Sequence, residues 1–306
     1  MMTRMPPPPP LPPGVEERFA NVDGVRVRYL EGGAGPPLVL IHGLLGYSFS
    51  WRLNLEVLAG NSRVYAVDLP GVGFSDRPRG MNASLTASAD RMLRFLDEVE
   101  VDTADLVATS HGGALALKMA LAGAESGRQR VQSLVLAAPA NPWSAHGKRL
   151  SRALGSTPGR WLVPHLVPLL APWCAGWFLR RQYGDPRRVP PGTVEGYLAP
   201  LSHPGMVNYA LQVLRHFNRD LKELGALLPA LAGLPVLFLW GTADPIVLPD
   251  SIAPLRARLP GSELVELPGV GHLPYEESPE AFNAAVGAFL SRARAAHAHV
   301  TIKGSA

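Results

Sequence analysis

The chain has 306 residues, of which 47% are hydrophobic and 18% are charged; this balance excludes global disorder and can bury a sizeable core. Its one cysteine, Cys174, excludes an intramolecular disulfide and suits a reducing cytoplasm, the compartment that we expect. The net charge is +4 without a basic-aromatic motif or a cluster of His and Cys ligands, so we expect neither nucleic acid nor metal to bind.

Residues 1–17 begin with a run of prolines, MMTRMPPPPPLPPG. Proline favours the extended polyproline II conformation and leaves this segment nothing to bury. The segment also lacks the continuous apolar stretch of a secretory signal. We therefore expect a disordered tail, with a ligand for a proline-binding domain as the alternative.

Strand-like and helix-like segments alternate between residues 18 and 140. The pair Asp23-Gly24 predicts a hairpin turn between strands at 19–22 and 25–30. The all-apolar run at 38–41 is typical of a strand buried on both faces. Further strands are expected at 63–67, 106–109 and 134–137, and helices at 51–58, 83–98 and 113–122.

The alternation stops at residues 141–231, which are rich in Pro, Trp and Arg and are expected to form short helices. Residues 141–220 contain ten Lys or Arg and three Asp or Glu, a local charge of +7, so the rest of the chain carries −3. An insertion between two strands of a parallel sheet would lie over the edge where such sheets bind ligands. We therefore predict a helical cap.

Within this cap, residues 161–179 approach the length of a membrane helix and carry no formal charge. Three prolines recur there at every fourth position, and each removes a helical N–H donor. We expect no membrane-spanning segment. The favoured interpretation is a broken apolar cover over a pocket, with contact to a membrane interface as the alternative.

The alternation resumes at residues 232–294, with strands at 236–240 and 263–266 and helices at 251–258 and 279–292. Residues 295–306 are expected to form a frayed C-terminal tail. Strands that alternate with helices predict an α/β fold with a mostly parallel sheet flanked by helices. Segments 18–140 and 232–294 would form this core.

Ser110 stands between a predicted strand and a predicted helix in the sequence LVATSHGG. Ala108, Gly112 and Gly113 are small, as a sharp strand-to-helix turn requires, although Ala108 occupies a position where glycine is usual. Such a turn exposes the hydroxyl at the edge of the sheet. Ser110 is therefore the predicted nucleophile.

A serine nucleophile needs a base, and the base needs an acid to orient it. His272 follows a predicted strand in a loop with two glycines, and Asp244 is the first acid after the strand at 236–240. We predict His272 as the general base and Asp244 as the acid. The alternatives are a surface histidine and an aspartate that only forms a turn.

The predicted oxyanion hole consists of the backbone N–H groups of Leu44 and His111. Leu44 lies in HGLLG, a loop whose glycines permit close approach to the nucleophile, and His111 begins the helix after Ser110. We expect the His42 side chain to be structural.

These motifs together resemble the α/β-hydrolase superfamily: HGLLG, DLPGVGFSDRP, SHGG, GTADPIV and GVGHLPYEESPEAF follow one another in that family's order. The resemblance implies an eight-stranded, mostly parallel sheet with a helical cap inserted after strand 6. It places the nucleophile, acid and base at Ser110, Asp244 and His272, and implies a structural turn at Asp68. It implies no cofactor.

Haloalkane dehalogenases and epoxide hydrolases of this superfamily have aspartate where this chain has Ser110, so the resemblance favours hydrolysis of carboxylic esters. We expect a small, largely apolar ester and water as substrates. The predicted substrate contacts are Tyr47, Trp51, Trp143 and Trp177, with Arg180 or Arg181 for a carboxylate.

Several alternatives stay open. Carbon–carbon bond hydrolases of ring-cleavage dienoates share the triad, but an aromatic residue follows their catalytic histidine, whereas Leu273 follows His272 here. A perhydrolase or lactonase is a further alternative, and so is a ligand-binding protein on the same fold. The oligomeric state is open.

Overall fold

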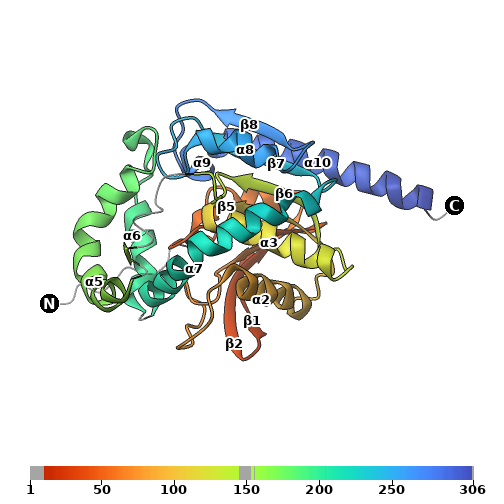
Figure 1. The fold of residues 1–306 in the computed structure, drawn as a ribbon. Helices are drawn as coiled ribbons and strands as arrows, with labels where there is room; N and C mark the ends of the chain where they lie inside the picture. The colour runs from red at the N-terminus through yellow and green to blue at the C-terminus, as the bar shows by residue number, and fades with distance from the viewer. Residues whose placement is uncertain (1–9, 145–152, 155, 204, 305–306) are drawn as a thin grey trace.

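The computed structural model describes residues 10–144, 153–154, 156–203 and 205–304. Positions 1–9 of the Pro-rich segment, residues 305–306 and three basic residues of the predicted cap lie outside the described residues (Lys148, Arg149 and Arg152). The described chain forms a central sheet with helices on both faces and a helical cap at one side (Figure 1).

The sheet has eight strands in the order β1-β2-β4-β3-β5-β6-β7-β8. Strand pairs β1–β2 and β2–β4 are antiparallel and the remaining pairs are parallel, which confirms the predicted fold class. The strands are β1 (Val15–Val22), β2 (Val25–Gly32), β3 (Pro37–Ile41), β4 (Arg63–Val67), β5 (Ala104–Thr109), β6 (Val131–Ala137), β7 (Val236–Gly241) and β8 (Glu263–Leu267).

The central strands bury the side chains on both of their faces. One apolar cluster therefore covers each face of the sheet. Helices α2, α3, α7 and α8 contribute to one cluster, and α1 and α10 to the other. The helices are α1 (Leu55–Ala59), α2 (Leu85–Glu98), α3 (Ser110–Glu125), α5 (Thr157–Arg180), α6 (Thr193–Leu198), α7 (Met206–Leu227), α8 (Ile252–Arg256), α9 (Pro274–Glu277) and α10 (Pro279–Gly304), with single-turn 3-10 helices at Ser48–Trp51, Pro186–Arg188, Ala199–Ser202, Leu228–Leu231 and Pro249–Ser251.

The cap lies between β6 and β7, as predicted, but its helices are not all short: α5 has 24 residues and α7 has 22. The hydroxyl of Ser156 accepts a hydrogen bond from the Gly159 N–H and so caps the first turn of α5. The prolines do not end α5. Its two halves, Trp161–Val167 and Leu169–Arg180, instead meet at 80°, because proline removes helical hydrogen bonds and bends the axis.

The last helix, α10, continues to Gly304 and passes the predicted end at residue 292. The sequence beyond that point is rich in alanine, which favours a helix. Arg294 also ties the helix to the sheet through a 2.7 Å ion pair with the nearly buried carboxylate of Asp105. The expected frayed tail from residue 295 is therefore wrong for the described part of this segment.

Candidate active site

Ser110 occupies a sharp turn between β5 and α3 and has a φ of +52°, a left-handed conformation that is strained for a residue with a side chain. The following glycines permit this turn. A Cβ on Gly112 would overlap the His42 carbonyl oxygen, and a Cβ on Gly113 would lie 2.7 Å from the Pro139 Cβ. The predicted nucleophile therefore stands on a turn that only small neighbours allow.

The loop after β3 lies directly against Ser110. A Cβ on Gly43 would be 3.2 Å from the Ser110 Cβ and 3.8 Å from its Oγ. Leu44 follows Gly43 in this loop, and His111 lies in the first turn of α3, where backbone N–H groups have no partner within the helix. The loop that contains Leu44 and the helix turn that contains His111 thus both adjoin the nucleophile.

The His42 side chain holds this loop in place. Its Nε2 accepts a hydrogen bond from the Leu69 N–H at 3.1 Å, so the proton is on Nδ1, which donates to the Gly43 carbonyl at 2.8 Å. Burial lowers the pKa of His42. The ring is a neutral, structural group, as expected from the sequence.

The predicted acid and base are joined. Asp244 Oδ2 accepts a 2.8 Å hydrogen bond from His272 Nδ1, and both side chains are buried. The other oxygen of Asp244 accepts from the N–H groups of Ile246 and Val247 at 2.7 and 3.0 Å. The backbone N–H of His272 donates a 2.7 Å hydrogen bond to the backbone carbonyl of Gln182 in the cap. Nε2 is therefore the nitrogen left for proton transfer.

Ser110 lies on the same sheet edge as this pair, because β5, β6, β7 and β8 are consecutive neighbours. Within the described residues the Ser110 hydroxyl has no hydrogen bond. Nucleophile contacts are commonly long before substrate binds.

Glu277, which the sequence analysis did not single out, supports the His272 loop. Its fully buried carboxylate accepts hydrogen bonds from the N–H groups of Gly271, Gly184 and Asp185 at 2.7, 2.9 and 2.9 Å. Arg188 lies 3.4 Å from the same carboxylate. Glu277 thus joins the residue before the catalytic histidine to the cap. In the sequence it is one of several acids before a helix and has no distinguishing signal.

The adjacent Glu276 forms a second buried link to the cap. Its carboxylate pairs with Arg52 at 3.0 Å and accepts from the hydroxyls of Tyr183 and Tyr197. Burial raises the pKa of both tyrosines, so they remain neutral donors at physiological pH.

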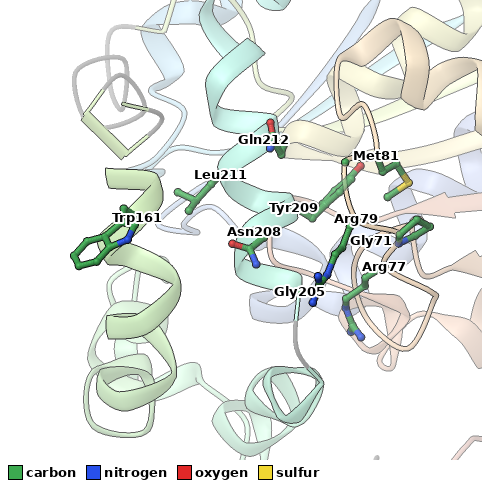
Figure 2. A pocket seen from close by; sticks show the side chains of 12 residues that line it. Gly71, Arg77, Arg79, Met81, Trp161, Gly205, Asn208, Tyr209, Leu211 and Gln212 are labelled. Carbon is green, nitrogen blue, oxygen red and sulfur yellow. The ribbon is translucent and has the colours of Figure 1, made fainter. Parts of the chain in front are cut away.

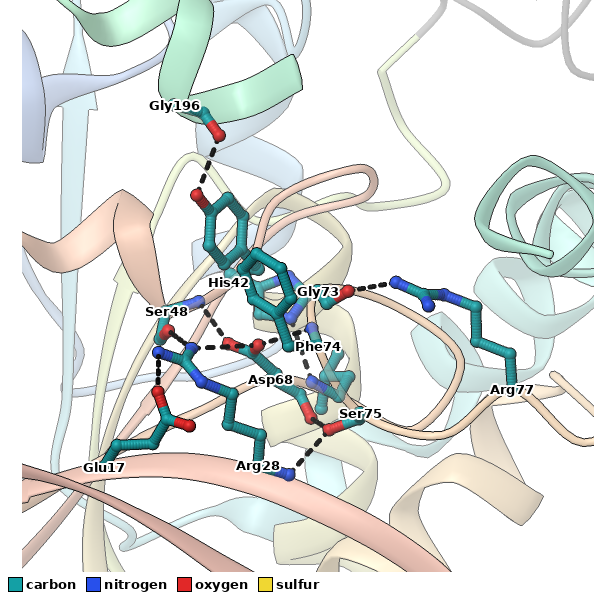
Figure 3. Close-up of polar contacts among 12 residues, drawn as sticks. Glu17, Arg28, His42, Ser48, Asp68, Gly73, Phe74, Ser75, Arg77 and Gly196 are labelled. Carbon is teal, nitrogen blue, oxygen red and sulfur yellow. Dashed lines mark hydrogen bonds and ion pairs between the residues drawn. The ribbon is translucent and has the colours of Figure 1, made fainter. Parts of the chain in front are cut away.

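Asp68 has the structural role that the resemblance implied. Its buried carboxylate accepts hydrogen bonds from the Ser48 N–H, the Phe74 N–H and the Arg28 guanidinium at 2.8, 2.8 and 3.1 Å (Figure 3). These contacts fix the loops after β3 and β4 relative to each other. The carboxylate has no free face for chemistry.

Two of the predicted substrate contacts are core residues. Trp51 is fully buried and packs on Tyr275 and Phe282 with ring centroids 4.8 and 6.3 Å apart, so the prediction that it contacts substrate is wrong. A large aromatic residue after the oxyanion loop fills the sheet–helix interface. Tyr47 is also buried, and its hydroxyl donates to the Gly196 carbonyl of α6.

The other predicted contacts lie in the cap or beside it. Trp143 is half-buried, with the Arg258 guanidinium 6.0 Å from its ring centroid. Trp177, Arg180 and Arg181 are exposed, and the Arg181 guanidinium lies 4.7 Å from the Trp177 ring centroid. The structure provides no direct contact between these side chains and the triad.

A cavity of about 620 Å³ lies between α5, α7 and the loop after β4 (Figure 2). Arg77, Arg79 and Trp161 line it together with the amides of Asn208 and Gln212. The triad and the six predicted contacts do not line it. Among the described residues, Arg79, Asn208 and Gln212 have no hydrogen-bond partner. Sequence analysis missed this site because its sides come from distant segments.

The His111 ring connects the nucleophile turn to the cap, because it stacks on Phe217 of α7 with centroids 6.4 Å apart. Burial, together with the nearby His42, lowers the pKa of His111 from 6.5 to about 4. The His111 imidazole therefore binds a proton more readily in the unfolded chain than in the folded chain. Stability is full above pH 6.5 and falls as the pH drops toward 4, by about 3 kcal/mol for this ring.

We expect His111→Leu to reduce that acid destabilisation, measured as the free energy of unfolding in urea between pH 7.5 and 4.5. His165→Gln, at an exposed position of α5, is the control and should leave the pH dependence unchanged. An identical pH dependence for His111→Leu and the wild type would contradict this prediction.

Comparison with known proteins shows the family of this chain. A family model described as "Alpha/beta hydrolase family" matches residues 38–285. The chain belongs to this family. A dihydrolipoyllysine-residue acetyltransferase component of an acetoin cleaving system from Cupriavidus necator is 33% identical over 268 residues, 87% of this chain and 67% of the relative.

Two further relatives are named for different activities. A 2-hydroxymuconate semialdehyde hydrolase from Pseudomonas sp. is 28% identical and covers 89% of this chain and 93% of the relative. The crystal structure of a membrane phospholipase A superposes with a TM-score of 0.74 at 27% identity, covering 92% of this chain and 87% of that one.

Proposed function

We propose that this hydrolase cleaves carboxylic esters of small, largely apolar substrates through an acyl-enzyme intermediate. One observation carries the proposal: the buried His272–Asp244 hydrogen bond lies on the sheet edge that also presents Ser110 on a strained turn. A buried imidazole held by a carboxylate beside a serine is the arrangement that activates a hydroxyl.

In the proposed mechanism, His272 Nε2 takes the Ser110 proton as Oγ attacks the ester carbonyl. The N–H groups of Leu44 and His111 stabilise the oxyanion, and loss of one such donor typically costs about 3 kcal/mol of transition-state stabilisation. His272 then protonates the leaving alcohol. Water, activated by the same imidazole, attacks the acyl-serine and releases the acid.

The nucleophile type supports acyl chemistry. A serine alkoxide attacks an acyl carbon and forms an acyl ester that water can cleave, whereas a carboxylate nucleophile displaces a leaving group from an alkyl carbon. The described sheet edge presents Ser110 and not a carboxylate at the turn after β5. The solved phospholipase A relative, by its name, also acts on a carboxylic ester.

The second candidate is carbon–carbon bond hydrolysis of a dienoate, as in the hydroxymuconate semialdehyde hydrolase relative. Arg77 and Arg79 line the cavity beside α7, and guanidinium groups pair with carboxylates, but no triad residue lines that cavity. The Arg77 Nε is buried without a partner among the described residues. Leu273, rather than an aromatic residue, next to His272 weighs against it.

The deciding experiment combines active-site labelling with a substrate panel. A fluorophosphonate probe should label the wild type and Ser126→Ala, which changes an exposed serine at the opposite, C-terminal end of α3, but it should not label Ser110→Ala. p-Nitrophenyl esters of graded acyl length should be hydrolysed, and Ser110→Ala should lower kcat by about 10⁴-fold or more.

Other results of this experiment would support different conclusions. Turnover of a dienoate but of no ester would support the second candidate. An unlabelled wild type that turns over neither substrate would contradict both and indicate a binding protein on this fold. Full esterase activity in Ser110→Ala would contradict the mechanism.

A further inference from the structure

The outer face of α5 is an exposed apolar surface. Eight of the fourteen exposed large hydrophobic side chains in the described chain belong to this one helix. In Figure 1 α5 forms the outer edge of the cap, away from the sheet. The eight are Trp161, Leu162, Leu166, Leu169, Leu170, Trp173, Trp177 and Phe178. The predicted cover over a pocket thus turns most of its apolar side chains to solvent.

These side chains form a continuous stripe in the second half of the helix. Leu169, Trp173 and Trp177 follow one another at intervals of four residues and are 68%, 87% and 61% exposed. Residues four apart lie on one helix face. Ala171 and Leu179, on the other side, are buried against the protein. A soluble monomer rarely exposes so large an apolar patch without a partner.

The charge around this stripe is positive. The helix α5 contains no Asp or Glu. Arg180 and Arg181 are exposed at its C-terminal end, and the Arg181 guanidinium covers the Trp177 ring at 4.7 Å. Between Thr157 and Arg188 the sequence has five arginines and one aspartate. Tryptophan rings within an apolar stripe that ends in arginines match the layered polarity of a membrane interface.

We propose that the α5 stripe, defined as Leu169, Leu170, Trp173, Trp177 and Phe178 with Arg180 and Arg181, docks this protein on an anionic lipid surface. The helix lies in the interface and does not cross it. Among the described helices none alone is long and apolar enough to span a bilayer; the two halves of α5, which meet at 80°, reach that length and composition only as a bent pair. Apolar side chains enter the acyl boundary while the arginines meet anionic headgroups.

A second copy of the chain fits this surface less well. In a cap-to-cap contact of either orientation the arginines of one stripe would find no carboxylate on the other, because α5 contains no Asp or Glu. An anionic headgroup layer has the complementary charge. The docking proposal is independent of the ester-hydrolase proposal, because its test measures binding to vesicles and not ester hydrolysis.

The test is flotation of the full-length protein with vesicles of phosphatidylcholine alone or of an equimolar mixture with phosphatidylglycerol. We expect at least about tenfold tighter binding to the anionic vesicles, with the preference lost at high salt, because two arginines contribute about tenfold or more together. Trp173→Ser/Trp177→Ser should lose binding by about tenfold. Arg180→Glu/Arg181→Glu should lose the preference for anionic vesicles.

The matched control is Val57→Ser/Leu227→Ser, which removes two exposed apolar side chains outside α5 and should bind like the wild type. Circular dichroism and thermal unfolding of every variant establish that it is folded, which is expected because all substituted side chains are exposed. Equal flotation of the wild type and of Trp173→Ser/Trp177→Ser would overturn the proposal. So would a wild type that does not float with either kind of vesicle. So would a dimer in vesicle-free buffer that dissociates on Trp173→Ser/Trp177→Ser.

Discussion

Asp244→Asn is expected to lower kcat for p-nitrophenyl ester hydrolysis by about 10⁴-fold while leaving the protein folded. The carboxylate accepts the 2.8 Å hydrogen bond from His272 Nδ1 and holds the proton there, so that Nε2 can take the Ser110 proton. An amide NH₂ in that position donates instead and selects the other tautomer, in which Nε2 carries the proton and cannot act as a base. The measurement is steady-state kinetics at pH 7.5.

Asp250→Asn provides the control, because this aspartate is exposed on the same segment. Its kcat should equal that of the wild type. An Asp244→Asn enzyme within tenfold of the wild-type kcat would remove Asp244 from the triad. Asp244 also accepts hydrogen bonds from the Ile246 and Val247 N–H groups, so its replacement could lower stability. The unfolding midpoint of Asp244→Asn separates such a loss of stability from a catalytic effect.

Glu277→Ala is expected to lower the free energy of unfolding by about 3–5 kcal/mol, because it leaves three backbone N–H groups without their buried acceptor. The same change frees Gly271, the residue before His272, from the cap. We therefore expect kcat to fall as well. Urea unfolding followed by tryptophan fluorescence gives the stability, and ester hydrolysis gives the activity.

Glu280→Ala is the matched control, since it removes an exposed carboxylate three residues further along. It should change stability by less than about 0.5 kcal/mol. A Glu277→Ala protein as stable as Glu280→Ala would show that water or rearrangement replaces the carboxylate, and the proposed support of the histidine loop would be wrong. Loss of activity with unchanged stability would assign Glu277 a more direct role.

The positions of the candidate triad could be predicted because each residue has a local signature at the end of a strand. Ser110 lies between a buried strand and two glycines, and the structure shows why: a Cβ on Gly112 would overlap the His42 carbonyl. Asp244 lies three residues after the buried strand β7, and His272 lies five residues after β8. Parallel strands deliver their carboxyl ends to one edge, so such signatures converge in space.

The substrate contacts could not be predicted in the same way. Trp51 and Trp177 are the same type of residue, yet one is fully buried against Phe282 and the other is 61% exposed. Which face a helix presents depends on what packs against it. Residue type alone gave no means of separating a core tryptophan from a surface one.

The sequence by itself determined the alternation of buried strands and amphipathic helices, the small residues around the nucleophile and the site of the insertion. These features follow from local backbone geometry and hydrophobic periodicity. Only the tertiary structure decided that Glu277 supports the histidine loop and that the α5 stripe faces outward. The physical reason is that burial and hydrogen bonding across distant segments depend on which chain surfaces meet, and no local pattern encodes that choice.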